Sequence, residues 1–357
     1  MLPSNWSRLP PCILVLVLAL QVAALTPARR SIDPLIHASR AEKRSINQNP
    51  DGSHFIWLPQ QEYSGQTFYD GFFFFNYPDP TNGHVNYVNE SYARERRLVY
   101  VEDDGTVIMK ADQETWLPRG QFRDSIRIES YARFDGGLFI LDLAKAPWGC
   151  GTWPAFWTVG NDWPWNGEID IIEGVHDNQH NQVAWHTAPG CRLDPSANFT
   201  GNIADGGGYQ HLDCNSFINH NAGCGATEWS RASYGPLFDE QGGGVFVMKW
   251  DENGIAVWSF FRAAVPRDID DGTPNPSEWG PPSAVLSSSM CDIRRFFKNH
   301  AIIFDITFCG DWAGNSYATS GCPGTCDERL MDPNNFVEDT SLRNGREPQL
   351  RVAWAGF

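Results

Sequence analysis

Three carboxylates stand close together in the segment GEIDIIEG, namely Glu168, Asp170 and Glu173. Carboxyl groups that face one site can divide the roles of nucleophile and proton donor between them. Successive side chains of a β-strand point to opposite faces, so Glu168 and Asp170 share one face and the isoleucines share the other. Strict alternation would place Glu173 among the isoleucines, where burial of an unpaired charge is costly.

A β-bulge after Asp170 resolves this conflict. If Ile171 and Ile172 together occupy one pleat position, Glu173 returns to the face that carries Glu168 and Asp170. Bulges are enriched beside active sites because they re-aim a side chain. We therefore predict a bulged strand with three carboxylates on one surface and the isoleucines against the core.

The rest of the chain supplies strands that can hold this segment in a sheet. Residues 243–262 contain two β-rich runs around a turn with Asn253-Gly254, which is a strong hairpin signal. Similar runs occur at 125–134, 137–143 and 301–308. Helical periodicity is scarce, and 33 Gly with 24 Pro supply many turns. The pattern predicts an all-β fold, either a β-sandwich or a jelly roll.

The composition indicates a large folded domain with an acidic surface. The 357 residues are 41% hydrophobic and 20% charged, with a formal net charge of −16. Residues 1–44 hold six Lys/Arg and two Asp/Glu, so their removal would lower the net charge to −20. Nucleic acid and anionic lipid bind basic patches, so we exclude both as partners and expect a neutral one.

The N-terminus has the pattern of a secretion signal. Arg8 precedes the apolar run CILVLVLAL, and the small residues of VAALTPA follow as a cleavage zone. We therefore predict a signal peptide over 1–25 and a secreted, extracellular protein. No second apolar run approaches the length of about 18 residues that crosses a bilayer, so we expect no membrane anchor.

A basic segment follows the predicted signal. Residues 26–44 contain the pairs Arg29-Arg30 and Lys43-Arg44, and secretory processing proteases cut at dibasic pairs. We predict a pro-segment over 26–44 and a single domain over 45–357. A plain surface linker is the alternative for 26–44.

Eight cysteines remain once Cys12 leaves with the signal. They are Cys150, Cys191, Cys214, Cys224, Cys291, Cys309, Cys322 and Cys326. An even number in a secreted chain predicts up to four disulfides, whose pairing the sequence cannot rank. Zinc at Cys322 and Cys326 is a disfavoured alternative because no Cys/His set with finger spacing accompanies them. The sequons at Asn89 and Asn198 suit the same compartment and predict a glycoprotein.

At this point a family resemblance can be stated. The segment GEIDIIEG matches the Glu-x-Asp-x-x-Glu signature of glycoside hydrolase family 16. The chain resembles the fungal laminarinase-like endo-1,3(4)-β-glucanases of that family from about residue 50 onward, in the segments TWPAFWTVGNDWPWNGEIDIIEGV, DPTNGHVNYV, AWHTAPGC and FCGDWAG. The resemblance implies a curved, concanavalin A-like jelly roll with a concave substrate cleft. It also implies retaining hydrolysis of a β-glucan polysaccharide.

The resemblance assigns roles to the three carboxylates. Glu168 would be the nucleophile and Glu173 the general acid/base, while Asp170 would hydrogen-bond Glu168 and add a like charge. Retaining hydrolysis needs the two carboxyl groups about 5 to 5.5 Å apart. Four pleat steps separate the backbones by roughly 13 Å, so two long glutamate side chains must lean toward each other.

Aromatic residues crowd the same region and predict sugar stacking. Sugar rings stack on flat aromatic surfaces, and we predict substrate binding by Trp153, Trp157, Trp163 and Trp312. Burial in the core is the alternative for each of them. The resemblance places His186 near the reacting sugar, whereas a lone histidine is otherwise a structural group.

Several alternatives stay open. The carboxylates could form an acidic solvated strand or a calcium site, although we predict no metal and no cofactor. A transglycosylase would use a sugar hydroxyl in place of water, and nothing in the motif separates it from a hydrolase. A non-catalytic glycan-binding sandwich has no need for a proton donor opposite a nucleophile. We expect a monomer.

Overall fold

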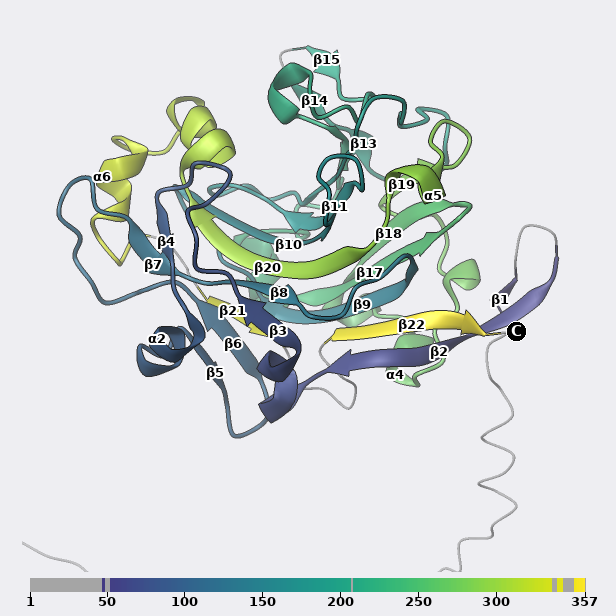
Figure 1. The fold of residues 1–357 in the computed structure, drawn as a ribbon, viewed down its shortest axis with the longest axis horizontal. Helices are drawn as coiled ribbons and strands as arrows, with labels where there is room; N and C mark the ends of the chain where they lie inside the picture. The colour runs from purple at the N-terminus through teal and green to yellow at the C-terminus, as the bar shows by residue number, and fades with distance from the viewer. Residues whose placement is uncertain (1–46, 49–51, 207, 336–338, 343–349, 357) are drawn as a thin grey trace, which may run out of the picture. The chain divides into compact units, whose positions relative to one another are not determined.

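Two large β-sheets make up most of the described chain (Figure 1). The computed structural model describes residues 47–48, 52–206, 208–335, 339–342 and 350–356, all within the unit Arg44–Phe357. The predicted signal peptide and pro-segment lie outside the described residues. The described strands confirm the predicted all-β sandwich, and all described neighbours within the two large sheets are antiparallel.

The first sheet carries the three carboxylates. Its eight described strands run in the order β13 (Asn202–Ile203), β16 (Cys224–Thr227), β12 (Gln182–His186), β11 (Glu168–Glu173), β10 (Thr152–Gly160), β20 (His300–Phe308), β8 (Arg127–Ser130) and β3 (Phe72–Phe74). Figure 1 shows β20 as a long arc, bent along its length. The motif strand β11 is therefore an inner strand with a partner on each side.

The second sheet lies against the first. Its main path among the described residues is β1 (Asn47–Gln48), β2 (His54–Tyr63), β22 (Leu350–Gly356), β9 (Gly137–Lys145), β17 (Gly244–Asp251), β18 (Gly254–Phe261) and β19 (Ala284–Ser287). Three further strands join it: β21 (Asp339–Leu342), β6 (Val107–Lys110) and β5 (Val99–Val101). The predicted hairpin is β17–β18, whose ladder closes at the Asp251–Gly254 pair.

The helices among the described residues are short, as the scarce helical periodicity predicts. They are α2 (Glu90–Glu95), α3 (Pro236–Glu240), α4 (Arg267–Asp270), α5 (Ile293–Phe296) and α6 (Cys326–Leu330). Smaller turns cover Gly65–Gly71, Asn219–Asn221, Arg262–Ala264, Pro276–Glu278, Gly310–Gly314 and Tyr317–Thr319. Two strand pairs stand apart from the large sheets, β4 (Val85–Tyr87) with β7 (Arg123–Ser125) and β14 (Asp205–Gly206) with β15 (Tyr209–Gln210). No helix in the described ranges has the length and apolar character needed to span a membrane.

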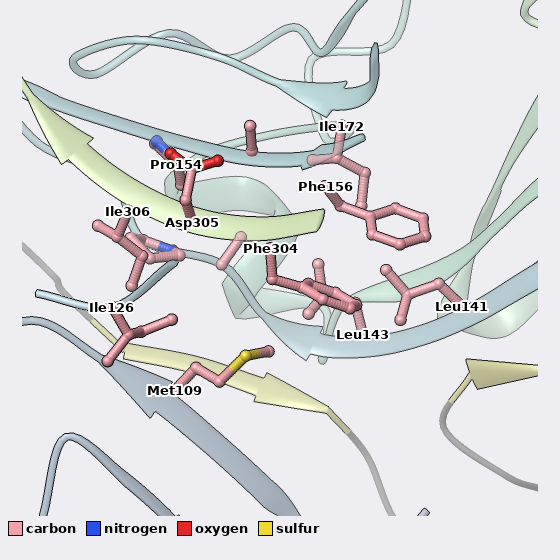
Figure 2. Close-up of a pocket in the computed structure, with 13 residues that line it drawn as sticks. Met109, Ile126, Leu141, Leu143, Pro154, Phe156, Ile172, Phe304, Asp305 and Ile306 are labelled. Atoms are coloured by element: carbon pink, nitrogen blue, oxygen red, sulfur yellow. The ribbon is translucent and has the colours of Figure 1, made fainter. Parts of the chain in front are cut away.

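The core fills the space between the two sheets. A cavity of about 30 Å³ lies there, and Figure 2 shows apolar side chains that line it, such as Phe156, Leu141 and Met109. Phe304 and Asp305 are neighbours on β20 and point to opposite sides of it in the same view. Alternation along β20 therefore gives the first sheet a core face and an opposite face, which we call the carboxylate face.

Four disulfides tie the described loops together, as the even number of cysteines predicts. They join Cys150 to Cys322, Cys191 to Cys291, Cys214 to Cys224 and Cys309 to Cys326. Cys322 and Cys326 thus bind different sulfur partners. The two sequon asparagines, Asn89 and Asn198, are both exposed, and their glycosylation stays a prediction.

Candidate active site

The motif strand β11 contains the predicted bulge. Phe156 of β10 lies opposite Ile172, and the next residue, Trp157, lies opposite Asp170, so Ile171 is the extra residue. Ile171 and Ile172 are buried against the core. The register returns Glu173 to the face that carries Asp170, which confirms the predicted arrangement.

A fourth carboxylate, Asp305, lies on the same face of the sheet two strands away from β11, on β20. Ala155 of β10 lies opposite Glu173 on one side and opposite Asp305 of β20 on the other. Adjacent strands are about 4.8 Å apart, so Asp305 lies two strand spacings from Glu173 on the carboxylate face. On the β12 side, His186 lies opposite Glu168.

The environment of Glu173 favours its protonated form. Desolvation is the largest cause and, with the charges of Glu168 and Asp305, raises the pKa of Glu173 to about 8. The indole Nε1 of Trp153 donates a 2.8 Å hydrogen bond to Glu173 Oε1, which acts in the opposite direction and lowers that pKa. Glu173 can therefore hold a proton at neutral pH.

Asp170 is buried between the two glutamates. Burial, followed by the charges of Glu168 and Glu173, holds the pKa of Asp170 well above its ordinary value. The neighbouring carboxyl of Glu168 also favours the protonated form of Asp170. The orienting role of Asp170 stays a prediction.

The imidazole of His186 lies on the other side of Asp170. Its Nε2 is 3.4 Å from Asp170 Oδ2, and its Nδ1 is 2.9 Å from Asn221 Oδ1. Gly223 packs against the ring, where a Cβ atom would lie 2.7 Å from His186 Cε1. The ring is thus fixed beside the carboxylates on three sides.

Asp305 holds the indole of Trp157. Trp157 Nε1 donates to Asp305 Oδ1 at 2.7 Å, and the Tyr87 hydroxyl donates to Oδ2 at 3.1 Å. The guanidinium of Arg127 lies 5.0 Å from the Trp157 ring centroid. Burial raises the pKa of Asp305 to about 6, although the Arg127 charge and the hydrogen bond from Trp157 lower it.

The predicted aromatic residues divide into two groups. Trp157 is half-buried on the carboxylate face, and Trp163, in the loop before β11, is 43% exposed, so both have surface for a ligand. Trp153 is buried, and Trp312 meets it edge-on with ring centroids 5.9 Å apart. Trp153 therefore has little free ring surface and contacts Glu173 through its N–H. Substrate binding by all four stays a prediction.

Sequence reasoning missed several residues of the site. Asp305 was passed over inside the apolar run AIIFDITF, although a single charge in such a run is a signal of a buried, partnered group. Tyr87 carries no local signal, because its partner Asp305 is 218 positions away. The carboxamide of Asn181 contacts Glu173, only 8 positions earlier, but this contact depends on how the chain turns between β11 and β12.

One group on this face could hold a cation. Ligand atoms of Glu168, Asp170 and His186 lie within 4.8 Å of one another. The expectation that the reaction uses no metal stays a prediction.

Comparisons with known proteins find similar sequences and structures. The sequence model described as "XgeA-like, catalytic GH16 domain" matches residues 72–340. A Schizosaccharomyces pombe protein named "Probable glycosidase" is 44% identical over 78% of this chain and 65% of its own length. The endo-1,3(4)-β-glucanase xgeA of Emericella nidulans is 41% identical over 78% of this chain and 44% of its own length. The chain thus spans about two fifths to two thirds of these relatives.

Solved structures are similar over nearly their whole length. Laminarinase 16A from Phanerochaete chrysosporium, solved with β-glucans in donor and acceptor sites, has a TM-score of 0.77 at 36% identity, covering 84% of this chain and 99% of its own. An elongating GH family 16 β-1,3-glucosyltransferase has a TM-score of 0.75 at 36% identity, covering 84% of this chain and 100% of its own.

Proposed function

The chain belongs to glycoside hydrolase family 16, and from this premise we propose that it is an endo-acting, retaining β-glucanase. Its substrates are β-1,3-linked and mixed β-1,3/1,4-linked glucans. The observation that carries this proposal is the pair Glu168 and Glu173 on one face of β11, with the pKa of Glu173 raised to about 8. Two carboxyl groups whose environments differ can serve as nucleophile and acid at the same pH.

In the first step, a carboxylate oxygen of Glu168 forms a bond to the anomeric carbon. The glycosidic C–O bond breaks, and Glu173 gives its proton to the leaving oxygen. A protonated Asp170 donates to Glu168 in the resting state and keeps its carboxylate oriented. The product of this step is a glycosyl-enzyme ester on Glu168.

In the second step, the carboxylate of Glu173 removes a proton from water. The water oxygen attacks the anomeric carbon, and the bond to Glu168 breaks. Two displacements at the same carbon return the original β configuration. The Trp153 hydrogen bond supports this half of the cycle because it stabilises the ionised form of Glu173.

The substrate class rests on two kinds of support. The name of the Emericella nidulans relative states endo-1,3(4)-β-glucanase activity, and laminarinase 16A was solved with β-glucans bound. On this chain, Trp157 lies opposite Asp170 and is half-buried, and Trp163 in the loop before β11 is exposed. Sugar rings stack on such aromatic surfaces.

Transglycosylation is a second candidate function, because one structural neighbour is an elongating β-1,3-glucosyltransferase. In that reaction a sugar hydroxyl takes the place of water in the second step. A third candidate, a non-catalytic glycan-binding sandwich, would leave the raised pKa of Glu173 without a use.

We also propose that the protein is exported. Four disulfides among the described residues suit an oxidising compartment, and the sequence begins with the predicted signal.

Purified protein incubated with laminarin, lichenan and xyloglucan tests the activity. We expect rapid shortening of laminarin and lichenan, with a β-anomeric first product by NMR. Longer glucans among the products would favour transglycosylation. An α-anomeric first product would exclude the retaining mechanism, and no change in any glucan, together with measurable binding, would favour the binding module.

A further inference from the structure

The bulge leaves part of β11 without a strand partner. The described ladder between β11 and β12 ends at the Asp170–Ala184 pair, so Ile171 and Glu173 lie beyond it on that side. A bulge disrupts the ladder locally, and buried backbone N–H and C=O groups need hydrogen-bond partners. Asn181, the residue just before β12, supplies a hydrogen-bond partner for the N–H of Glu173 and for the C=O of Ile171.

The carboxamide of Asn181 bridges the two ends of the bulge. Its Oδ1 accepts the backbone N–H of Glu173 at 2.9 Å, and its Nδ2 donates to the backbone C=O of Ile171 at 2.9 Å. Asn181 is fully buried. A carboxamide carries an acceptor and a donor in one plane, so a single side chain satisfies both backbone groups.

A buried glutamate fixes the orientation of this carboxamide. Asn181 Nδ2 also donates to Glu228 Oε1 at 3.3 Å, while Ser283 donates to Oε2 at 3.2 Å. The backbone N–H of Glu228 donates to the carbonyl of Asn181 at 2.9 Å, and the N–H of Asn181 donates to Ser233 Oγ at 2.9 Å. A flip of the amide would turn its oxygen toward the Ile171 carbonyl and Glu228 Oε1 and its NH₂ group toward the Glu173 N–H, so these three contacts together favour one orientation.

We propose that Asn181 is a positioning residue for Glu173, which it holds in place through the backbone of the bulge, and that Glu228 sets the orientation of its carboxamide. This inference rests on the proposed role of Glu173 as the general acid. A displacement of about 1 Å in a reacting group can lower a rate by roughly 10²-fold. Loss of the carboxamide should therefore weaken acid catalysis more than any other step.

The test compares two substrates of the same enzyme. A laminari-oligosaccharide has a poor leaving group and needs the acid, whereas a dinitrophenyl β-laminaribioside does not need it to form the glycosyl-enzyme. In Asn181→Ala we expect the glycosylation rate to fall about 100-fold on the oligosaccharide. The burst of dinitrophenol should slow less than about fivefold, because it needs no acid.

Asn275→Ala is the matched control. It removes the same group from another buried asparagine, which is 2% exposed and lies between α4 and the Pro276–Glu278 turn. We expect it to affect both substrates equally. The proposal would be overturned if Asn181→Ala lost rate equally on both substrates. It would also be overturned if Asn275→Ala lost much more rate on the oligosaccharide than on the dinitrophenyl glycoside.

A second variant keeps the proposal testable if Asn181→Ala does not fold. In Asn181→Asp, the introduced carboxyl can accept from Glu173 N–H and, when protonated, can donate to the Ile171 carbonyl. We expect activity on the oligosaccharide to recover at acidic pH and to fall as the introduced group ionises, with the dinitrophenyl burst unchanged. A pH profile parallel to that of the wild type would contradict the role of the donated hydrogen bond.

The wild-type measurements separate this inference from the proposed function. A wild-type enzyme that cleaves neither substrate would remove the proposed function. If the wild type cleaves both substrates but the Asn181 variants lose rate equally on each, only the proposed role of Asn181 would be wrong. Carboxyl ¹³C NMR of Glu173 needs no substrate. A change in the pKa of Glu173 from about 8 in Asn181→Ala, with no change in Asn275→Ala, would support the positioning role, and an unchanged pKa in both variants would contradict it.

Discussion

The indole N–H of Trp153 donates a 2.8 Å hydrogen bond to Oε1 of Glu173. Because a donated hydrogen bond stabilises the carboxylate, it lowers the pKa of Glu173 against the larger effect of burial. The pKa of about 8 is thus a balance between opposing contributions. A variant that removes the Trp153 hydrogen bond should therefore raise the pKa of Glu173, and one that removes the Asp305 charge should lower it.

Trp153→Phe should raise the pKa of Glu173 above about 8. Phenylalanine fills much of the same space without the N–H donor, so the carboxylate loses its stabilisation. We expect the alkaline limb of kcat/KM to move up by about one pH unit, since one unit corresponds to about 1.4 kcal/mol. The full pH–rate profile checks this, and a limb that moves to lower pH would contradict it.

Asp305→Asn should shift the same limb the other way. The pKa of Asp305 is about 6, so this carboxyl is ionised near pH 8, where its charge raises the pKa of Glu173. Asparagine removes the charge and keeps an oxygen for the Trp157 N–H. We expect the limb to fall by up to about one unit. The comparison with Trp153→Phe is decisive, because nonspecific damage to the site would not move the alkaline limb up in one variant and down in the other.

Glu228 should make folding stability depend on pH. Burial raises its pKa from 4.5 to about 7, so the folded protein binds this proton more tightly than the unfolded chain does. The stabilisation is fully present below the unfolded pKa and is lost as the pH rises through about 7. It amounts to up to about 3 kcal/mol. The unfolding temperature of the wild type should therefore fall between pH 5 and pH 8.

In Glu228→Gln this fall should be smaller, because a neutral amide has no proton to lose. Differential scanning calorimetry across the pH range measures the slope. The exposed Glu252 offers the control Glu252→Gln, which should keep the wild-type slope. Identical slopes in both variants would show that Glu228 does not titrate as described.

The division of labour between the two glutamates predicts different responses to azide. Glu173→Ala should stall on glucan but still form a glycosyl-enzyme from an activated aryl glycoside, and azide should release a β-glycosyl azide from it. Glu168→Ala cannot form that intermediate, so azide should give at most the α-product. Reversed products in two variants with native-like melting would reverse the assignment.

The strand that carries the carboxylates was predictable because its signal is local. The spacing of Glu168, Asp170 and Glu173 around three isoleucines allows one face assignment that avoids a buried charge, and the register confirms it. The β17–β18 hairpin was predictable for the same reason, since its turn residues adjoin its strands.

The network around that strand was not predictable. Asp305 reaches Trp157 across 148 positions, and Glu228 reaches Asn181 across 47. Disulfide partners are separated by between 10 and 172 positions, and no spacing rule orders them. Such contacts depend on how the strands are ordered in the sheet, which a single sequence leaves open.

The extra residue in β11 also has an evolutionary consequence. Without Ile171 the strand would read Glu-x-Asp-x-Glu, and simple alternation would still place both glutamates on one face, the same four pleat steps apart. The insertion therefore does not change where the glutamates lie, but it does leave two backbone groups that Asn181 must satisfy. A relative with the shorter strand has no such need. Across the family, strand length and the residue at position 181 should therefore co-vary, with asparagine retained where the insertion is present.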